Sequence, residues 1–198
     1  MTGRFLITGL PRSRTAWLSV VADMMPGATC EHEPLHWLPR WEDVGQIWER
    51  STSRFAGVSD SGLAVHLAEV LARFAPRTVI VLRSISAVRG SLARIWMPPP
   101  PGLLELMQRV LDSVLLSTVP VMVVRYSDLA DEKTVLDVLS YLMPGAELDR
   151  DRVHRMMRMN VQSDLAYTRE IAANRIGDVV ALMGQGTIDH MRDACLSS

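Results

Sequence analysis

The chain has 198 residues, of which 48% are hydrophobic, so it is long enough to bury a substantial core as one domain. Its formal net charge of −1 argues against a general surface for nucleic acid or anionic membranes, although a local basic pocket is compatible with it. The N-terminus runs directly into a strand pattern, no apolar run approaches a membrane span, and two cysteines are too few for a disulfide framework. We therefore expect a single domain, residues 1–198, in a soluble cytoplasmic protein.

The first structural unit expected along the chain is a strand, a turn and a helix within residues 4–19. Phe5 to Ile7 are β-prone, and apolar residues from Trp17 onward recur at helical spacing. The polar turn between them therefore lies at a helix N-terminus, where unpaired backbone N–H groups and the helix dipole attract anions. Arg12 and Arg14 add positive charge, so a phosphate or sulfate group is the expected ligand. The simpler interpretation is a strand-to-helix turn with two exposed arginines.

Strands and helices alternate through the rest of the chain. Apolar runs predict strands at 28–31, 54–59, 78–82 and 120–124, the last two buried on both faces. Helical spacing predicts helices near 47–50 and at 61–74, 86–96, 103–115 and 131–142, and again from residue 149 onward. This alternation favours parallel pairing by right-handed crossovers. The expected fold is a three-layer α/β/α sandwich with a central, mainly parallel sheet and a helical C-terminal third.

Several polar residues follow the expected strands directly. Residues 8–14, Asp60, Arg83 and Arg125 all take this position, so they are expected at the rim of the sheet where ligands of parallel sheets bind. Arg83 ends a buried strand, where a charge needs a partner, so it binds either a phosphate or a structural carboxylate. Asp60 is better explained as a helix N-cap than as a contact to a substrate, and Ser86 and Asp131 are the expected caps of two later helices.

Three segments, taken in order, resemble the sulfotransferases that use 3′-phosphoadenylyl sulfate (PAPS). Residues 10–15, Leu-Pro-Arg-Ser-Arg-Thr, resemble that family's Pro-Arg-Ser-Gly-Thr loop, which binds the 5′-phosphosulfate. Residues 79–83 and Ser91 resemble its second signature, a strand ending in Arg and a Ser eight residues later, which bind the 3′-phosphate. Residues 123–129 are similar to its strand ending in Tyr-Glu-Asp-Leu. The resemblance covers residues 4 to 160.

The resemblance implies a P-loop NTPase-like sandwich that transfers a sulfuryl group from PAPS to an acceptor hydroxyl or amine, without a metal ion. It implies that the 5′-phosphosulfate is bound by Pro11, Arg12, Ser13, Arg14, Thr15 and Ala16, and the 3′-phosphate by Arg83 and Ser91. Arg12 would also stabilise the leaving phosphate, because positioning and charge stabilisation are the main tasks in such a transfer.

The chain departs from the family pattern at two places. Arg14 stands where the family has Gly, so its side chain points outward, contacts the sulfate or prevents PAPS binding. The family's late Arg-Lys-Gly segment has only a faint counterpart at residues 174–177.

A sulfuryl transfer also needs a general base that takes the proton of the acceptor. The candidates are Glu31, His32 and Glu33. In an extended segment His32 points away from the two glutamates, and Pro34 biases Glu33 toward extended backbone. The sulfotransferases that this chain resembles have a His or Glu beside the acceptor, and their bacterial members often have a Glu before a Pro at this position. The resemblance therefore makes Glu33 the first choice as catalytic base and His32 the second. The alternative is a solvated carboxylate beside a structural histidine.

The acceptor is expected to be a small molecule or a carbohydrate. Trp37, Trp41 and Trp48 could line an aromatic acceptor pocket or could pack a long loop against the domain. Only residues 34–54 and Pro98 to Pro101 offer a lid, so the acceptor site is expected to be open or to be completed by the second subunit of a homodimer. Two other functions fit the pattern: a kinase or nucleotide-binding enzyme with a divergent P-loop, although the Lys and second Gly of the ATP-type loop are missing, and a non-catalytic binding protein.

Overall fold

The computed structural model of the chain describes residues 3–95 and 97–158. Its centre is a five-stranded, wholly parallel sheet in the order β2-β3-β1-β4-β5. The strands are β1 (Gly3–Gly9), β2 (Ala28–His32), β3 (Phe55–Ser59), β4 (Arg77–Leu82) and β5 (Val121–Arg125). All five predicted strands are thus confirmed.

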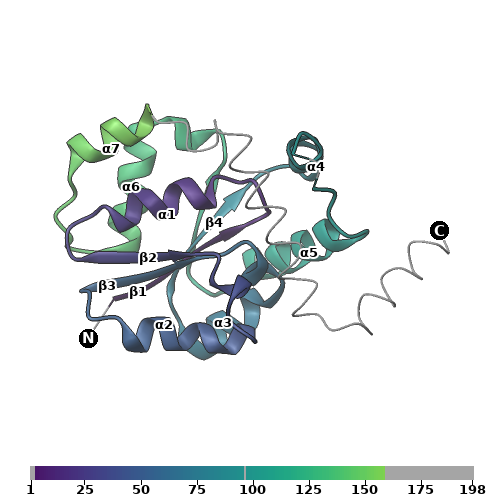
Figure 1. Cartoon of the computed structure of the whole chain (residues 1–198), viewed down its shortest axis with the longest axis horizontal. Coiled ribbons are helices and arrows are strands. Elements are labelled where there is room, and N and C mark those ends of the chain that lie inside the picture. Colours follow the sequence, from purple (N-terminus) through teal and green to yellow (C-terminus); the bar gives the residue numbers. More distant parts are fainter. Residues whose placement is uncertain (1–2, 96, 159–198) are drawn as a thin grey trace.

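Helices cover both faces of this sheet. The α-helices are α1 (Thr15–Asp23), α2 (Val44–Arg50), α3 (Leu67–Phe74), α4 (Ile85–Ala93), α5 (Leu103–Leu115), α6 (Glu132–Leu142) and α7 (Arg150–Met157). Figure 1 shows α1, α6 and α7 on one side of the sheet and α2, α3 and α5 on the other. This arrangement confirms the predicted α/β/α sandwich, because each parallel crossover places its helix on a face of the sheet.

The central strand β1 contributes side chains to the cores on both faces of the sheet. Leu6 packs into the core that the sheet forms with α2, α3 and α5, whereas Phe5 and Ile7 pack into the core that it forms with α1, α6 and α7. Successive side chains of a strand point to opposite faces, so a strand covered on both faces must be apolar at every position.

Two helix ends differ from the sequence-based expectation. Helix α4 begins earlier than predicted, and its N-cap is Ser84, whose Oγ accepts a hydrogen bond from the Ala87 N–H at 3.3 Å, rather than Ser86. The predicted helix at 61–74 is divided into a 3₁₀-helix, η3 (Gly62–His66), and α3. The predicted cap Asp131 is confirmed, since its carboxylate accepts from the Thr134 N–H at 2.9 Å.

Strand β5 was expected to be buried on both faces, and this expectation is wrong. It forms one edge of the sheet, where Val124 is buried but Val123 is 42% exposed. The order of strands decides this exposure, because an edge strand has a neighbour on one side only.

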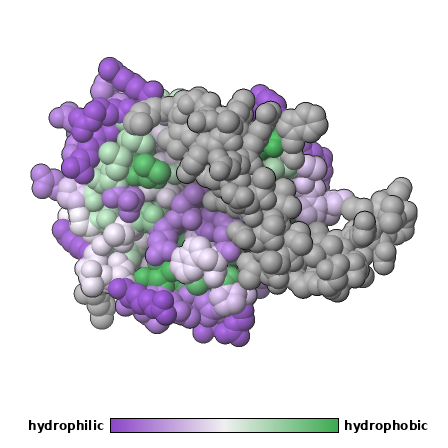
Figure 2. All heavy atoms as spheres, viewed as in Figure 1, coloured by the Kyte–Doolittle hydropathy of each residue, from purple (hydrophilic) through white to green (hydrophobic). Residues whose placement is uncertain are grey.

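The predicted C-terminal helical region is confirmed as far as α7, whose Val153 and Met156 are buried while its outer surface is hydrophilic (Figure 2). Residues 174–177 lie outside the described residues. No helix within residues 3–95 and 97–158 is long and apolar enough to cross a membrane.

The close approach of β1 and β4 gives a test of the fold. A Cβ atom added to Gly9 would lie 2.4 Å from the backbone carbonyl oxygen of Val81, and Gly9 has a φ of 155°. Gly9→Ala should therefore lower the free energy of unfolding by about 2–4 kcal/mol, measured by urea denaturation. Gly90→Ala is the matched control, since nothing lies within 4 Å of its added Cβ in helix α4. It should be neutral or stabilise by about 0.5–1 kcal/mol, and equal effects of the two substitutions would contradict this account.

Candidate functional site

The loop between β1 and α1 is a tight turn in which two arginines take an unusual backbone conformation. Arg12 and Arg14 both have a φ of 64°, in the left-handed region that favours glycine. Neighbouring strands hold the turn in place, because the Ser59 hydroxyl donates to the Thr15 carbonyl at 3.0 Å and the Thr8 hydroxyl donates to the Asp60 carbonyl at 2.8 Å. Backbone strain of this kind persists where surrounding structure fixes it, and it is frequent at binding sites.

Three predicted phosphate-binding residues from separate segments meet at this loop. The Arg12 side chain donates from Nε to the Ser91 hydroxyl at 3.2 Å, and Arg83 donates from Nη1 to the carbonyl oxygen of Arg12. Arg83 follows the last residue of β4, and the eight-residue spacing brings Ser91 to the buried side of α4 that contacts the loop. The fold therefore unites the two signatures that the sequence kept 71 or more positions apart.

The arginines at this point form no ion pair with a carboxylate among the described residues. Burial, followed by the charge of Arg83, lowers the pKa of Arg12, while the negative charge of Glu33 acts in the opposite direction. None of the ion pairs among the described residues includes Arg12, Arg14 or Arg83. A partly buried guanidinium without a carboxylate is stabilised by an anionic ligand.

The hydroxyl group of Ser13 adds a second sign of an anion site. It is fully buried and has no hydrogen-bond partner among the residues that the structure describes. Buried polar groups normally have partners, and a phosphate or sulfate oxygen at the N-terminus of α1 would provide one. Thr15, the first residue of α1, and Ala16 continue the loop into the helix as predicted.

The side chain of Arg14 is directed toward β5 and the turn after it. Its Nη1 donates to the Leu129 carbonyl oxygen at 3.1 Å, and its guanidinium carbon lies 5.0 Å from the centre of the Tyr126 ring. Arg83 also contacts this ring, with its guanidinium carbon 4.1 Å from the ring centre. Arg14 therefore keeps the left-handed backbone that a glycine would favour while its side chain joins the loop to residues 126–129.

A groove of about 550 Å³ continues the site along the ends of β4 and β5. Its lining includes Arg83, Ser84, Arg125, Tyr126 and Ser127. Arg125 thus lies at the rim with Arg83, as the sequence predicted from its position at the end of a strand.

The predicted geometry of the catalytic base is wrong. Strand β2 ends at His32, and Glu33 has a φ of 48° rather than an extended backbone, although Pro34 follows it. Its N–H donates to the Ser59 carbonyl at 2.6 Å, and the chain then enters a 3₁₀-helix, η1 (Pro34–His36). As a result His32 and Glu33 are not on opposite sides, since His32 Nε2 lies 3.8 Å from Glu33 Oε2. Glu31, the third candidate, is exposed.

His36 was not among the site residues predicted from the sequence. Its Nε2 lies 3.0 Å from Glu33 Oε2, closer than that of His32. A 3₁₀-turn places residues i and i+3 on one side, so the spacing of Glu33 and His36 around a proline was a usable signal.

Asp60 joins this segment to η3. The N-cap position of η3 is Ser61, and the carboxylate of the preceding Asp60 accepts from the Gly62 N–H at 2.7 Å and from the Leu35 N–H at 3.0 Å. Only 2% of Asp60 is exposed, and this burial raises the pKa of Asp60 to about 6, with the charge of Glu33 adding to the effect and the two N–H donors opposing it. The Asp60 carboxylate therefore anchors the turn that carries Glu33.

The three tryptophans near the site have different environments. Trp48 is buried and meets the Phe74 ring edge-on, with 5.4 Å between ring centres, and Trp41 stacks on His66 at 5.5 Å. Both therefore pack the long loop against the domain. Trp37 is 56% exposed and has no ring contact within the part of the chain that the structure describes, so its ring is the most accessible of the three.

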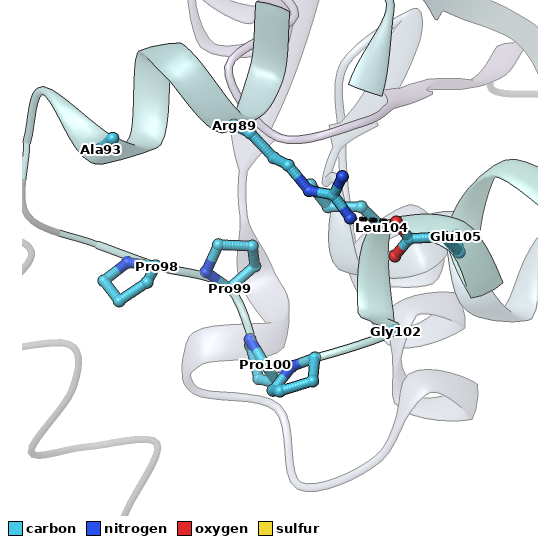
Figure 3. Close-up of a pocket in the computed structure, with 9 residues that line it drawn as sticks. Arg89, Ala93, Pro98, Pro99, Pro100, Gly102, Leu104 and Glu105 are labelled. Carbon is cyan, nitrogen blue, oxygen red and sulfur yellow. Dashed lines mark hydrogen bonds and ion pairs between the residues drawn. The ribbon is translucent and has the colours of Figure 1, made fainter. Parts of the chain in front are cut away.

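The segment Pro98 to Pro101 lines a pocket of about 290 Å³ with residues of α4 and α5 (Figure 3). Arg89 and Glu105 form an ion pair at this pocket. Arg89 and Ala93 are each two residues from Ser91, which is about 200° around a helix, so the pocket and the loop contact opposite sides of α4. No residue that lines it was predicted to bind PAPS or the acceptor.

Comparison with known proteins identifies the fold. No protein-family model and no curated protein matches the sequence. Among solved structures, mouse sulfotransferase SULT7A1 in complex with PAP is 12% identical, with a TM-score of 0.51 over 100% of this chain and 89% of that chain. A sulfotransferase from Alicyclobacillus acidocaldarius is 15% identical, with a TM-score of 0.49 over 92% of this chain and 95% of that chain. The chain has the sulfotransferase fold, as its three motifs predicted.

The left-handed backbone at Arg14 can be tested by comparing two truncations. Arg14→Gly and Arg14→Ala both remove the bond to Leu129, but only alanine keeps the steric penalty at a φ of 64°. The glycine variant should be more stable by about 1 kcal/mol in urea denaturation. Equal stability of the two variants would show that the loop relaxes away from this conformation.

The buried carboxyl group of Asp60 predicts a dependence of stability on pH. The pKa of Asp60, raised to about 6, lies above that of an unfolded aspartate, so the native state binds this proton more tightly. Stability from this group therefore rises as pH falls from about 7 toward about 4, by up to about 3 kcal/mol. The difference in unfolding free energy between wild type and Asp60→Asn should grow in favour of wild type over this range. A difference that stays constant with pH would contradict the assignment.

Proposed function

We propose that the protein transfers a sulfuryl group from PAPS to the hydroxyl or amine of a small-molecule or carbohydrate acceptor. The observation that carries the proposal is the meeting of Arg12, Arg83 and Ser91 beside the N-terminus of α1, with no carboxylate paired to either arginine among the described residues. The complex of mouse SULT7A1 with PAP, a protein of the same fold, supports this choice of nucleotide.

The loop before α1 would bind one end of the nucleotide, and residues at the end of β4 and in α4 would bind the other end. The backbone N–H groups at the start of α1, with Ser13 and Thr15, would bind the 5′-phosphosulfate. Arg83 and Ser91 would bind the 3′-phosphate, and Arg12, which contacts both of them, would stabilise the charge that develops on the leaving phosphate. Arg12 and Ser91 are already held by neighbours, so little ordering is required on binding.

Glu33 is the proposed general base. Its charge acts on Arg12, which places it in electrostatic reach of the loop, and its Oε2 lies near two imidazoles. Asp60 is less suited to this role, because its carboxylate is buried and accepts from two backbone N–H groups. His32 remains the second candidate, since it lies on the same side as Glu33. The exposed ring of Trp37, four residues after Glu33, offers a surface on which a sugar or an aromatic acceptor could stack.

Thermal denaturation with adenosine 3′,5′-bisphosphate tests the proposal. The ligand should raise Tm without Mg²⁺, because binding to the native state alone stabilises it. Arg83→Gln should weaken binding of this ligand at least roughly tenfold, since a charge-assisted hydrogen bond to phosphate is lost.

Arg50→Gln is the matched control, because Arg50 is exposed on α2 and bonds to Gln46 at 2.9 Å, so its binding should equal that of wild type. Stabilisation by Mg²⁺ and ATP but not by adenosine 3′,5′-bisphosphate would favour a divergent kinase. Indifference to both ligands would favour a non-catalytic binding protein.

A further inference from the structure

The imidazole of His36 lies beside the Glu33 carboxylate. His36 Nε2 lies 3.0 Å from Glu33 Oε2, and the two side chains are 32% and 18% exposed. An ionised carboxylate can only accept hydrogen bonds, so the Nε2 atom of His36 must carry the hydrogen when Glu33 is charged. The His36 imidazole therefore fixes the position of one oxygen of the Glu33 carboxylate.

The turn that forms this pair is fixed at several points. The Glu33 N–H is bound to Ser59, the Leu35 N–H to the Asp60 carboxylate, and the His36 N–H to the Glu33 carbonyl at 3.2 Å. The Leu38 N–H closes the turn by donating to the Pro34 carbonyl at 2.9 Å. These bonds hold Glu33 at a φ of 48°, a conformation that costs about 1–3 kcal/mol and persists only when neighbours impose it.

We propose that His36 is a positioning residue that orients Glu33 as the general base of the acceptor site. This inference rests on the proposed function. The imidazole N–H fixes Oε2 and favours the charged carboxylate, which receives the proton of the acceptor. A base in a fixed orientation avoids the loss of rate that follows from small errors of position.

The sulfuryl transfer requires only PAPS, the acceptor and the residues named above. The acceptor oxygen forms a bond to sulfur, and the bond between sulfur and the 5′-phosphate oxygen of PAPS breaks. The electron pair of that bond leaves on adenosine 3′,5′-bisphosphate, whose charge Arg12 faces, while the acceptor proton passes to Glu33. His36 keeps its own proton throughout.

Other charged groups lie near the Glu33–His36 pair and also affect how the rate depends on pH. His32 Nε2 lies 3.8 Å from Glu33 Oε2, Asp60 is bound to the same turn, and Glu33 acts electrostatically on both Asp60 and Arg12. A change in pH dependence must therefore be assigned by substitution of His36 itself.

The test compares His36→Ala, His36→Asn and His36→Gln in the full chain. Release of adenosine 3′,5′-bisphosphate from PAPS is measured over a pH series, with water alone and with glycerol as a simple alcohol acceptor. His36→Ala and His36→Asn should lower kcat roughly tenfold and move the acid limb of the profile to higher pH, because the carboxylate loses a hydrogen-bond donor. KM for PAPS and the Tm increase with adenosine 3′,5′-bisphosphate should stay unchanged.

The glutamine variant should recover most of the rate, since its side-chain N–H can reach the place of Nε2, whereas the shorter asparagine cannot. His154→Gln is the matched control, because His154 on α7 pairs with Glu132 at 2.9 Å in the same way but belongs to no part of the site. Wild-type kcat and an unmoved acid limb in all His36 variants would overturn the role of His36 alone. Binding of adenosine 3′,5′-bisphosphate by wild type without any turnover of PAPS would overturn the proposed transfer and this inference with it.

Discussion

The site is organised around the half-buried guanidinium of Arg12. Its Nε donates to the Ser91 hydroxyl, Arg83 donates to the backbone carbonyl of Arg12, and burial together with the charge of Arg83 lowers the pKa of Arg12. Such an arrangement is unfavourable by itself, and the strained turn that carries it adds to the cost. An anion at the start of α1 would offset both costs, which is consistent with the proposed phosphate site.

The order of the strands distributes charge along the rim of the sheet. Glu33 and Asp60 follow β2 and β3 at one end, the phosphate loop follows β1 in the middle, and Arg83 and Arg125 follow β4 and β5 at the other end. Under the proposed function, the nucleotide with its two anionic ends would bind on the basic side, and the acceptor that loses a proton would bind on the acidic side. Parallel pairing places both sides within one site, because all carboxyl ends of the strands lie together.

Local patterns predicted most of the fold, and the resemblance to the sulfotransferases selected Arg12, Arg83 and Ser91, which the structure brings together. Apolar runs marked the strands, helical spacing marked the helices, and the short motifs at 10–15 and at Arg83 with Ser91 depend on fixed local spacing. The backbone geometry of Glu33, the proposed base, was predicted less well. Pro34 favours extended backbone at Glu33, but bonds from Ser59 and Asp60, 26 or more residues away along the chain, outweigh this local preference. The same bonds bring His36 to Glu33.

The sequence by itself determined where the strands lie and where the turn before α1 lies, because apolar runs and turn residues are local patterns. The link between Arg83 and Ser91 came from the resemblance to the sulfotransferases. Only the tertiary structure decided that β5 is an edge strand, that Arg14 turns toward Tyr126, and that Glu33 is paired with His36. These features depend on the order of the strands and on hydrogen bonds between distant segments. A local sequence pattern does not contain these long-range interactions, so it cannot predict them.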